Sequence, residues 1–280
     1  MKDRLFFRKT AAAAALASTL FSWFIRPGTE HEKEIADLSA VDYAHRGLHD
    51  AKAGIPENSL AAFRRAAEHG FGIELDVHMT KDKELVVIHD HDTVRMTKFA
   101  GKVEEMTLTE LRSLKLQGTN ESIPTFDEVL SCVKGRVPLL VEIKPIRYNM
   151  EELTERVCAA LSGYKGKYCI ECFDPRVIAV LRRNHPEIVR GQLLMYMHKN
   201  NNYEQPAAVD FMLRNLLTNF WTRPDFIAYH FPERKNLMLR VCRRMFRVWE
   251  LDWTVTDETQ YQAVKDDRCT AIFEQFIPKS

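Results

Sequence analysis

The chain has 280 residues, a length that one α/β barrel can fill by itself. Apolar residues make up 45% of it, which is ordinary for a globular protein with a sizeable core. The 40 basic and 39 acidic residues give a formal charge of +1, and no long basic run with interleaved aromatic residues occurs. Composition and charge therefore argue against nucleic acid as a partner.

The N-terminal segment has a basic head, over residues 1–9, followed by an apolar run over residues 11–25. This order is typical of a signal anchor or a signal peptide. The run is short for a hydrocarbon core of ~30 Å unless the flanking basic residues snorkel, and no convincing cleavage site follows it. We therefore expect membrane association through residues 5–25. A cleaved signal and a soluble extension of a cytoplasmic protein are the alternatives.

A charged linker is expected over residues 27–39, and from residue 40 onward strand-like and helix-like segments alternate. Such alternation indicates βα units around a parallel sheet, and about eight strands in one domain favour a closed TIM barrel. The predicted division is an N-terminal segment with its linker, residues 1–39, and a barrel domain, residues 40–280. Predicted strands cover residues 41–45, 72–77, 85–89, 138–143, 167–173, 188–194, 226–229, 247–251 and 270–273. Predicted helices cover residues 59–69, 125–133, 150–161, 175–184, 207–220, 237–246 and 258–265.

The nine predicted strands are one more than the eight strands of a TIM barrel. Only five residues, 80–84, separate the second and third strand-like runs, and a parallel crossover needs about a dozen. Either these two runs form a hairpin, or one of them lies outside the barrel. We expect a TIM barrel with a short insertion after the third strand, and residues 90–122 can form a lid.

Two of the six cysteines, Cys169 and Cys172, are close enough in sequence to suggest a zinc or redox pair. They fall in a predicted strand, where positions three apart point to opposite faces. A zinc site needs converging sulfurs, so free structural thiols are predicted instead.

Carboxylates lie in the predicted strands near the edge where barrel enzymes build their active sites. Glu74 and Asp76 are two apart and therefore project from one face, and Glu142 occupies a similar position on another strand. Three carboxylates from two strands make a hard oxygen site that suits Mg²⁺ or Ca²⁺. A cation would relieve the mutual repulsion that otherwise raises their pKa values.

Basic residues accompany these carboxylates. Arg46 and Lys144 can neutralise a phosphodiester, Arg46 through two-point hydrogen bonding. His45 and His89 can give and take a proton near neutral pH. Each feature alone is more often a solvated or structural residue, but four strand ends carry such residues between apolar neighbours. Their conjunction indicates an active site.

In order from residue 44 to residue 257, the motifs of this chain resemble those of the glycerophosphodiester phosphodiesterase family. The resemblance implies a TIM barrel that binds a divalent metal and hydrolyses glycerophosphodiesters to an alcohol and sn-glycerol 3-phosphate. The matching motifs are AHRG (44–47), PENS (56–59), ELDV (74–77), TKD (80–82), LVVIHD (85–90), PTF (124–126), EIKP (142–145), FD (173–174) and WTVTD (253–257). The implied roles are metal ligands for Glu74, Asp76 and Glu142, acid–base catalysis for His45 and His89, phosphate binding for Arg46 and Lys144, and the glycerol side for Trp253.

Two departures from the family pattern concern Cys172, where the family usually has Ser, and Glu274, in place of a usual Thr-Asp-x-Pro ending. They bear on substrate choice more than on chemistry. The alternatives are a lysophospholipase D-like activity on membrane lysophospholipids and a non-catalytic headgroup-binding module. We assign no catalytic role to the other histidines near these motifs, His49, His78, His91 and His230.

Overall fold

The computed structural model describes residue 19 and residues 21–196 and 207–279. In this part of the chain nine strands pair in the order β1-β9-β8-β7-β6-β5-β4-β2-β3, and a pairing of β1 with β2 closes the ring. All pairings within the ring are parallel, whereas β3 runs antiparallel to β2. The predicted TIM barrel is confirmed. The strands are β1 (Tyr43–Ala44), β2 (Gly72–Met79), β3 (Leu85–Val87), β4 (Leu139–Ile143), β5 (Tyr168–Cys172), β6 (Arg190–Leu194), β7 (Phe226–His230), β8 (Trp249–Val255) and β9 (Thr270–Phe273).

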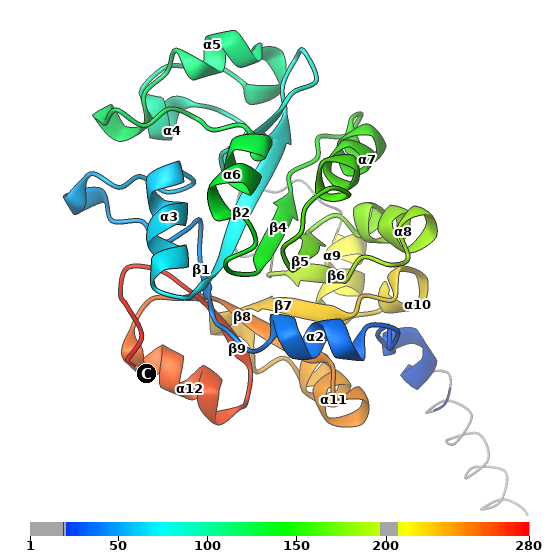
Figure 1. The fold of residues 1–280 in the computed structure, drawn as a ribbon. Helices are drawn as coiled ribbons and strands as arrows, with labels where there is room; N and C mark the ends of the chain where they lie inside the picture. Colours follow the sequence, from blue (N-terminus) through cyan, green and yellow to red (C-terminus); the bar gives the residue numbers. More distant parts are fainter. Residues whose placement is uncertain (1–18, 20, 197–206, 280) are drawn as a thin grey trace, which may run out of the picture.

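The ninth strand candidate is the second arm of a hairpin. The far end of β2 pairs with β3 outside the ring, as the short link between them requires. The insertion follows β3, as predicted, and lies beyond the end of β2 in Figure 1. It contains α4 (Val94–Thr97), η2 (Val103–Glu105), α5 (Leu108–Arg112) and η3 (Leu116–Gly118). Its own apolar cluster comprises Val86, Ile88, Met96, Val103, Leu111, Leu116 and Ile123.

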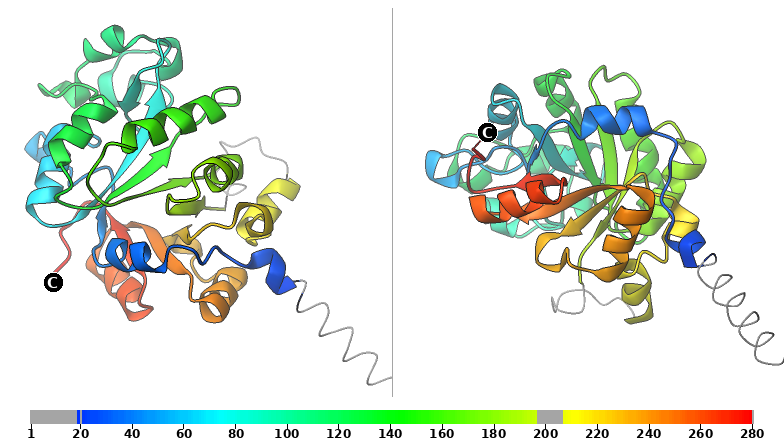
Figure 2. Two further views of the ribbon diagram at one scale, coloured as in Figure 1. Left: turned by 45° about the vertical axis from the view of Figure 1, so that its right-hand side comes forward. Right: turned by 90° about the horizontal axis from the view of Figure 1, so that it is seen from below.

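The helices surround the strands (Figures 1 and 2). Three of them have the predicted bounds. The helix expected over residues 207–220 is divided, because Leu216 adopts a positive φ of 59° that a helix cannot continue through. Besides α4 and α5 of the insertion, the α-helices described after β1 are α3 (Leu60–Glu68), α6 (Phe126–Val133), α7 (Met150–Leu161), α8 (Pro175–Asn184), α9 (Ala207–Arg214), α10 (Asn219–Thr222), α11 (Leu237–Phe246) and α12 (Glu258–Asp266).

Apolar side chains on the two faces of the strands form separate clusters. Tyr43, Leu140 and Phe226 come from distant strands of the ring and pack together, so this cluster fills the barrel interior. The larger cluster lies between the strands and the outer helices. Cys169 belongs to the first cluster and Cys172 to the second, and both are free. The opposite facing of these two thiols is confirmed.

Part of the expected linker is helical. Helix α2 (Glu32–Leu38) runs beneath the barrel strands in Figure 1. Its last residue, Leu38, is buried in the interior cluster, and the carbonyl of Leu38 accepts a hydrogen bond from Tyr43 Oη at 2.9 Å. Ile35 also packs against this cluster, and Asp37 pairs with Lys167 at 2.9 Å. The prediction of a charged linker did not include this helix.

Most of the predicted membrane anchor, residues 5–25, lies outside the described residues, which exclude residues 1–18 and 20. The end of the apolar run packs on the barrel: Ile25 is fully buried, and its carbonyl accepts a hydrogen bond from Asn219 Nδ2 at 2.9 Å. Within residues 19, 21–196 and 207–279, no helix combines the length and apolar character needed to cross a membrane.

Candidate active site

Three carboxylates form a row across neighbouring strands. In the parallel register Asp76 of β2 pairs with Glu142 of β4, which pairs with Glu171 of β5. Paired residues of parallel strands project to the same side, and Glu74 joins them because it lies two positions before Asp76. All four are buried. Ligand oxygens of Glu74, Asp76 and Glu142 lie within 4.8 Å of one another, so the structure brings the predicted trio together.

Burial and like charge act on this row. Burial, followed by repulsion from Asp76 and Glu142, raises the pKa of Glu74 well above its usual value. Burial also opposes ionisation of Asp76, but the nearby charges of Lys144, His89 and Arg46 outweigh it and lower the Asp76 pKa. The row therefore carries negative charge that depends on neighbouring cations.

Lys144 and Arg46 lie against these carboxylates. Lys144 Nζ is 2.7 Å from Glu142 Oε1 and 3.1 Å from Asp76 Oδ1. The backbone N–H of Arg46 donates to Glu74 Oε2 at 2.8 Å, from a left-handed conformation with φ 55°. Both predicted cations are thus within the same site.

His45 follows β1 and is held by the chain's other end. Its Nδ1 lies 2.7 Å from Glu274 Oε2, and its Nε2 lies 3.9 Å from Glu74 Oε2. Burial lowers the pKa of His45, while the Glu274 hydrogen bond opposes that shift. Glu274 follows β9, and its backbone N–H donates to Val255 O. Sequence reasoning left its role open, although its place at a strand end was a usable signal.

His89 is held by a chain of charged residues. Its Nδ1 lies 2.7 Å from Asp90 Oδ1, and Asp90 Oδ2 accepts from Arg95 Nε at 2.6 Å. Arg95 makes two hydrogen bonds to Glu57, at 2.7 and 2.8 Å, and Glu57 also accepts from Arg46 Nη1 at 2.8 Å. Through α4, the insertion therefore connects the second histidine to the first loop of the barrel.

These side chains share one cavity of about 270 Å³. One wall is charged, and the other is apolar around Trp253, whose ring meets Phe173 edge-on at a centroid distance of 5.6 Å. Of the eight predicted site residues, seven line the cavity, and Asp76 is buried without lining it. The lining residues are His45, Arg46, Glu74, His89, Glu142, Lys144, Glu171, Phe173, Leu193, Met195, Trp253 and Ile272.

Comparison with known families identifies this arrangement. The model of the "Glycerophosphoryl diester phosphodiesterase family" matches residues 45–277. The chain belongs to this family. It thereby has the sequence and the scaffold of an enzyme class that hydrolyses phosphoric diesters.

Named relatives agree with the assignment. A glycerophosphodiester phosphodiesterase of Caldanaerobacter subterraneus is 39% identical over 166 residues, which are 56% of this chain and 67% of the relative. In eight of the curated relatives, the matched region spans 47–69% of their length. A solved glycerophosphodiester phosphodiesterase of Thermotoga maritima has a TM-score of 0.64 and 26% identity, covering 83% of this chain and 94% of that one.

A second solved structure is a phosphodiesterase of Oleispira antarctica in complex with the product sn-glycerol-3-phosphate. It has a TM-score of 0.71 and 22% identity, and covers 86% of this chain and 94% of that one. At this identity the likeness supports the fold.

The carboxylates of this family member fit a divalent cation. The trio of Glu74, Asp76 and Glu142 is buried and oxygen-only, the donor set that Mg²⁺ and Ca²⁺ prefer. Beside it, Glu171 Oε2 is buried and makes no hydrogen bond to any described residue. Burial, then repulsion from Glu142, raises the Glu171 pKa. Sequence reasoning missed Glu171, because its alignment with Glu142 depends on strand register.

In this phosphodiesterase-family chain, Cys172 faces away from the cavity. Its Sγ lies 3.0 Å from Ile143 O and accepts from the backbone N–H of Asp174 at 3.3 Å. The departure from the family's usual Ser therefore affects packing between strands and helices, since Cys172 does not line the cavity.

Proposed function

We propose that this chain hydrolyses glycerophosphodiesters to an alcohol and sn-glycerol 3-phosphate, with a divalent metal ion and with His45 and His89 as the acid–base pair. The observation that supports this most is the convergence of carboxylates, imidazoles and cationic side chains on one cavity. The product named for the Oleispira antarctica structure has the chemistry this cavity suits.

Substrate binding divides between the two walls. Arg46 and Lys144 hold the phosphate through charge-assisted hydrogen bonds. Arg46 Nε makes no hydrogen bond to the described residues, although it lies 3.6 Å from Asp76 Oδ2, and it can donate to a phosphate oxygen once Asp76 holds the metal ion. Trp253 and Phe173 contact the carbon skeleton of the glycerol.

Glu74, Asp76 and Glu142 hold Mg²⁺ or Ca²⁺. When bound, the ion neutralises charge that develops on the phosphoryl oxygens. Lys144, now paired with Asp76 and Glu142, is then available to the phosphate. Glu171, next to Glu142 on the neighbouring strand, adds a fourth carboxylate beside the ion.

The two histidines take different roles. Because burial lowers its pKa, His45 is neutral at neutral pH, and Glu274 holds its Nδ1 so that Nε2 can accept a proton. His89 donates a proton to the leaving alkoxide, and the carboxylate of Asp90 holds its Nδ1 at 2.7 Å. The nucleophile is water or the glycerol 2-hydroxyl.

Residues 40–280 form the catalytic barrel in this proposal, and residues 1–39 form a separate N-terminal segment that reaches the barrel through Ile25 and α2. Residues 5–25 give membrane association. Flotation with anionic vesicles tests this: the full chain should float, and a chain without residues 1–18 should not. Equal flotation of both would reject the anchor.

The catalytic proposal is tested with metal-stripped enzyme to which each cation is restored singly. Glycerophosphocholine and glycerophosphoethanolamine should release sn-glycerol 3-phosphate, and lysophosphatidylcholine should be a poor substrate. His45→Ala and His89→Ala should each lower kcat by about 10²–10⁴-fold, the usual contribution of acid–base catalysis. His185→Ala, which alters a histidine paired with Glu155 outside the cavity, is the matched control.

Near wild-type turnover in both cavity variants would overturn the histidine assignment. Faster turnover of lysophosphatidylcholine would favour a lysophospholipase D. Binding of diesters without turnover under any cation would identify a headgroup-binding module.

A further inference from the structure

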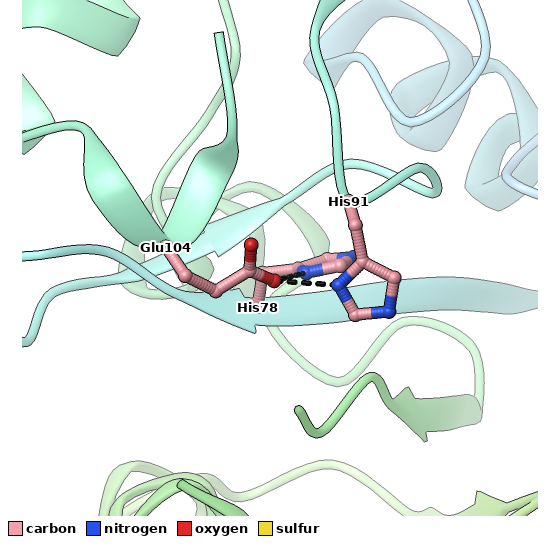
Figure 3. Close-up of side chains that lie close together, drawn as sticks. All are labelled: His78, His91 and Glu104. Atoms are coloured by element: carbon pink, nitrogen blue, oxygen red, sulfur yellow. Dashed lines mark hydrogen bonds and ion pairs between the residues drawn. The ribbon is translucent and has the colours of Figure 1, made fainter. Parts of the chain in front are cut away.

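Two histidines and a glutamate converge outside the cavity, where the insertion meets β2. His78 Nδ1 and His91 Nδ1 lie 2.9 and 2.6 Å from the same atom, Glu104 Oε1 (Figure 3). His78 projects from β2, His91 from the loop after β3, and Glu104 from η2. One ligand atom from each residue lies within 4.8 Å of the others.

The two ring nitrogens of His78 face different acceptors. Its Nε2 lies 3.2 Å from the carbonyl oxygen of His89, so Nε2 must carry a proton to donate. Its Nδ1 faces the carboxylate of Glu104 in a place where the His78 side chain has no exposure to water. A cation bound between Nδ1 and Glu104 would satisfy both groups.

The surroundings match those of protein metal sites. A histidine that binds metal usually donates its other ring N–H to a backbone carbonyl or a carboxylate, as His78 does to His89. Glu104 is nearly buried, whereas the His91 side chain is 49% exposed and leaves one side open to water. Bond lengths of 2.0–2.1 Å place tetrahedral ligand atoms about 3.3 Å apart, so His91 need move only by several tenths of an ångström.

We propose that His78 Nδ1, His91 Nδ1 and Glu104 Oε1 form a second metal site, selective for a transition-metal ion of the Zn²⁺ type, with water as the fourth ligand. Two imidazoles and one carboxylate suit Zn²⁺, whereas the oxygen-only trio in the cavity suits Mg²⁺ or Ca²⁺. The two sites therefore take different ions.

The site has a structural role. It joins η2 and the loop after β3 to β2, and its ligand His78 holds the backbone of His89. Binding of Zn²⁺ thus fixes the segment that carries His89.

The proposal is tested by measuring Zn²⁺ binding to the full chain. Mg²⁺ is present in large excess, so that it occupies the carboxylate trio. After desalting, elemental analysis should find about one Zn²⁺ per chain. His91→Ala and Glu104→Gln should each weaken Zn²⁺ binding at least about 10-fold. His185→Ala should bind as wild type, because His185 faces Glu155 and Glu187 through different ring nitrogens and belongs to no three-residue metal cluster among the described residues.

Two further measurements locate the ion. Co²⁺ in place of Zn²⁺ should give the visible absorption of a four-coordinate ion in the wild type and lose it in His91→Ala. Glu142→Gln should retain Zn²⁺, because Glu142 belongs to the other site. No retained Zn²⁺ in the wild type would overturn the proposal and leave His78 as a buried imidazolium. Zn²⁺ lost from Glu142→Gln but kept by His91→Ala would overturn it as well.

Discussion

At the scale of single residues, His45 depends on a carboxylate 229 positions away. Glu274 fixes which nitrogen of His45 carries the proton, in the way that a buried carboxylate orients the histidine of a hydrolase triad. Burial opposes ionisation of Glu274, but the hydrogen bond from His45 and the nearby imidazole of His49, 3.7 Å away, outweigh it and lower the Glu274 pKa. Glu274 is therefore a charged positioning residue at neutral pH.

Glu274→Gln tests that role. We expect kcat to fall by about 100-fold with KM little changed, because the variant disturbs the tautomer rather than phosphate binding. The active form of His45 is neutral and its pKa is lowered, so the acid limb of the pH profile should lie below the ordinary imidazole value of ~6.5. Glu274 raises this pKa, and its neutralisation should move the limb to lower pH.

The pH profile of kcat/KM on glycerophosphocholine measures both effects. A limb displaced to higher pH, or a change in KM alone, would contradict the assignment. Glu151→Gln, which neutralises an exposed carboxylate outside the cavity, serves as the control.

At the scale of elements, the insertion braces the site through α4. Arg95 connects Asp90, the partner of His89, with Glu57, the partner of Arg46. Arg95 of the insertion thus joins the loop of His89 to the loop of Arg46.

Arg95→Met should lower kcat/KM by about 10-fold, because Glu57 and Asp90 lose their shared cation while Arg46 and His89 lose their alignment. Arg112→Met is a matched control, since Arg112 also joins the insertion to the barrel, through Glu128 at 2.7 Å, but outside the cavity. Steady-state kinetics with both variants separates alignment from a general loss of stability. Equal losses in the two variants would contradict a specific role for Arg95.

Strand β6 needs a glycine where it passes the acidic row. Gly191 pairs in register with Glu171 on one side and Phe226 on the other, and an added Cβ would overlap the Phe226 ring. Gly191→Ala should therefore destabilise the fold by about 1–3 kcal/mol, the usual cost of overpacking. Gly163→Ala, where a Cβ meets nothing within 4 Å, is the control in thermal unfolding. Unchanged stability at Gly191 would show that the ring relaxes freely.

At the scale of the whole molecule, the buried carboxylates bring repulsive charge together from three strands of the barrel. Glu74 and Asp76 belong to β2, Glu142 to β4 and Glu171 to β5, so a cation bound among them would join strands distant in sequence. The repulsion that raises the Glu74 pKa is also a cost to folding without the ion.

Mg²⁺ or Ca²⁺ restored to stripped protein should therefore raise the melting temperature. At 100 times its dissociation constant the ion stabilises by about 2.7 kcal/mol, a shift of roughly 5 °C or more for a chain of this size. Glu142→Gln should lose most of that shift, while Glu151→Gln, an exposed carboxylate paired with Arg183, should keep it. A shift of equal size in both variants would place the ion elsewhere.

The sequence by itself determined the barrel and most of the predicted site residues, since both depend on local patterns. Alternating periodicity marked the strands, and spacing by two put Glu74 and Asp76 on one face. Even the hairpin of β2 and β3 was implicit in a link of five residues. The metal and catalytic roles of these residues stay predictions.

Only the tertiary structure decided which distant residues meet. Strand register put Glu171 beside Glu142, and ring closure brought Glu274 to His45. Packing, not composition, made residues 32–38 a helix on the barrel. The convergence of His78, His91 and Glu104 likewise depends on the path of the insertion. Such contacts follow from long-range geometry, which no local pattern of residues encodes.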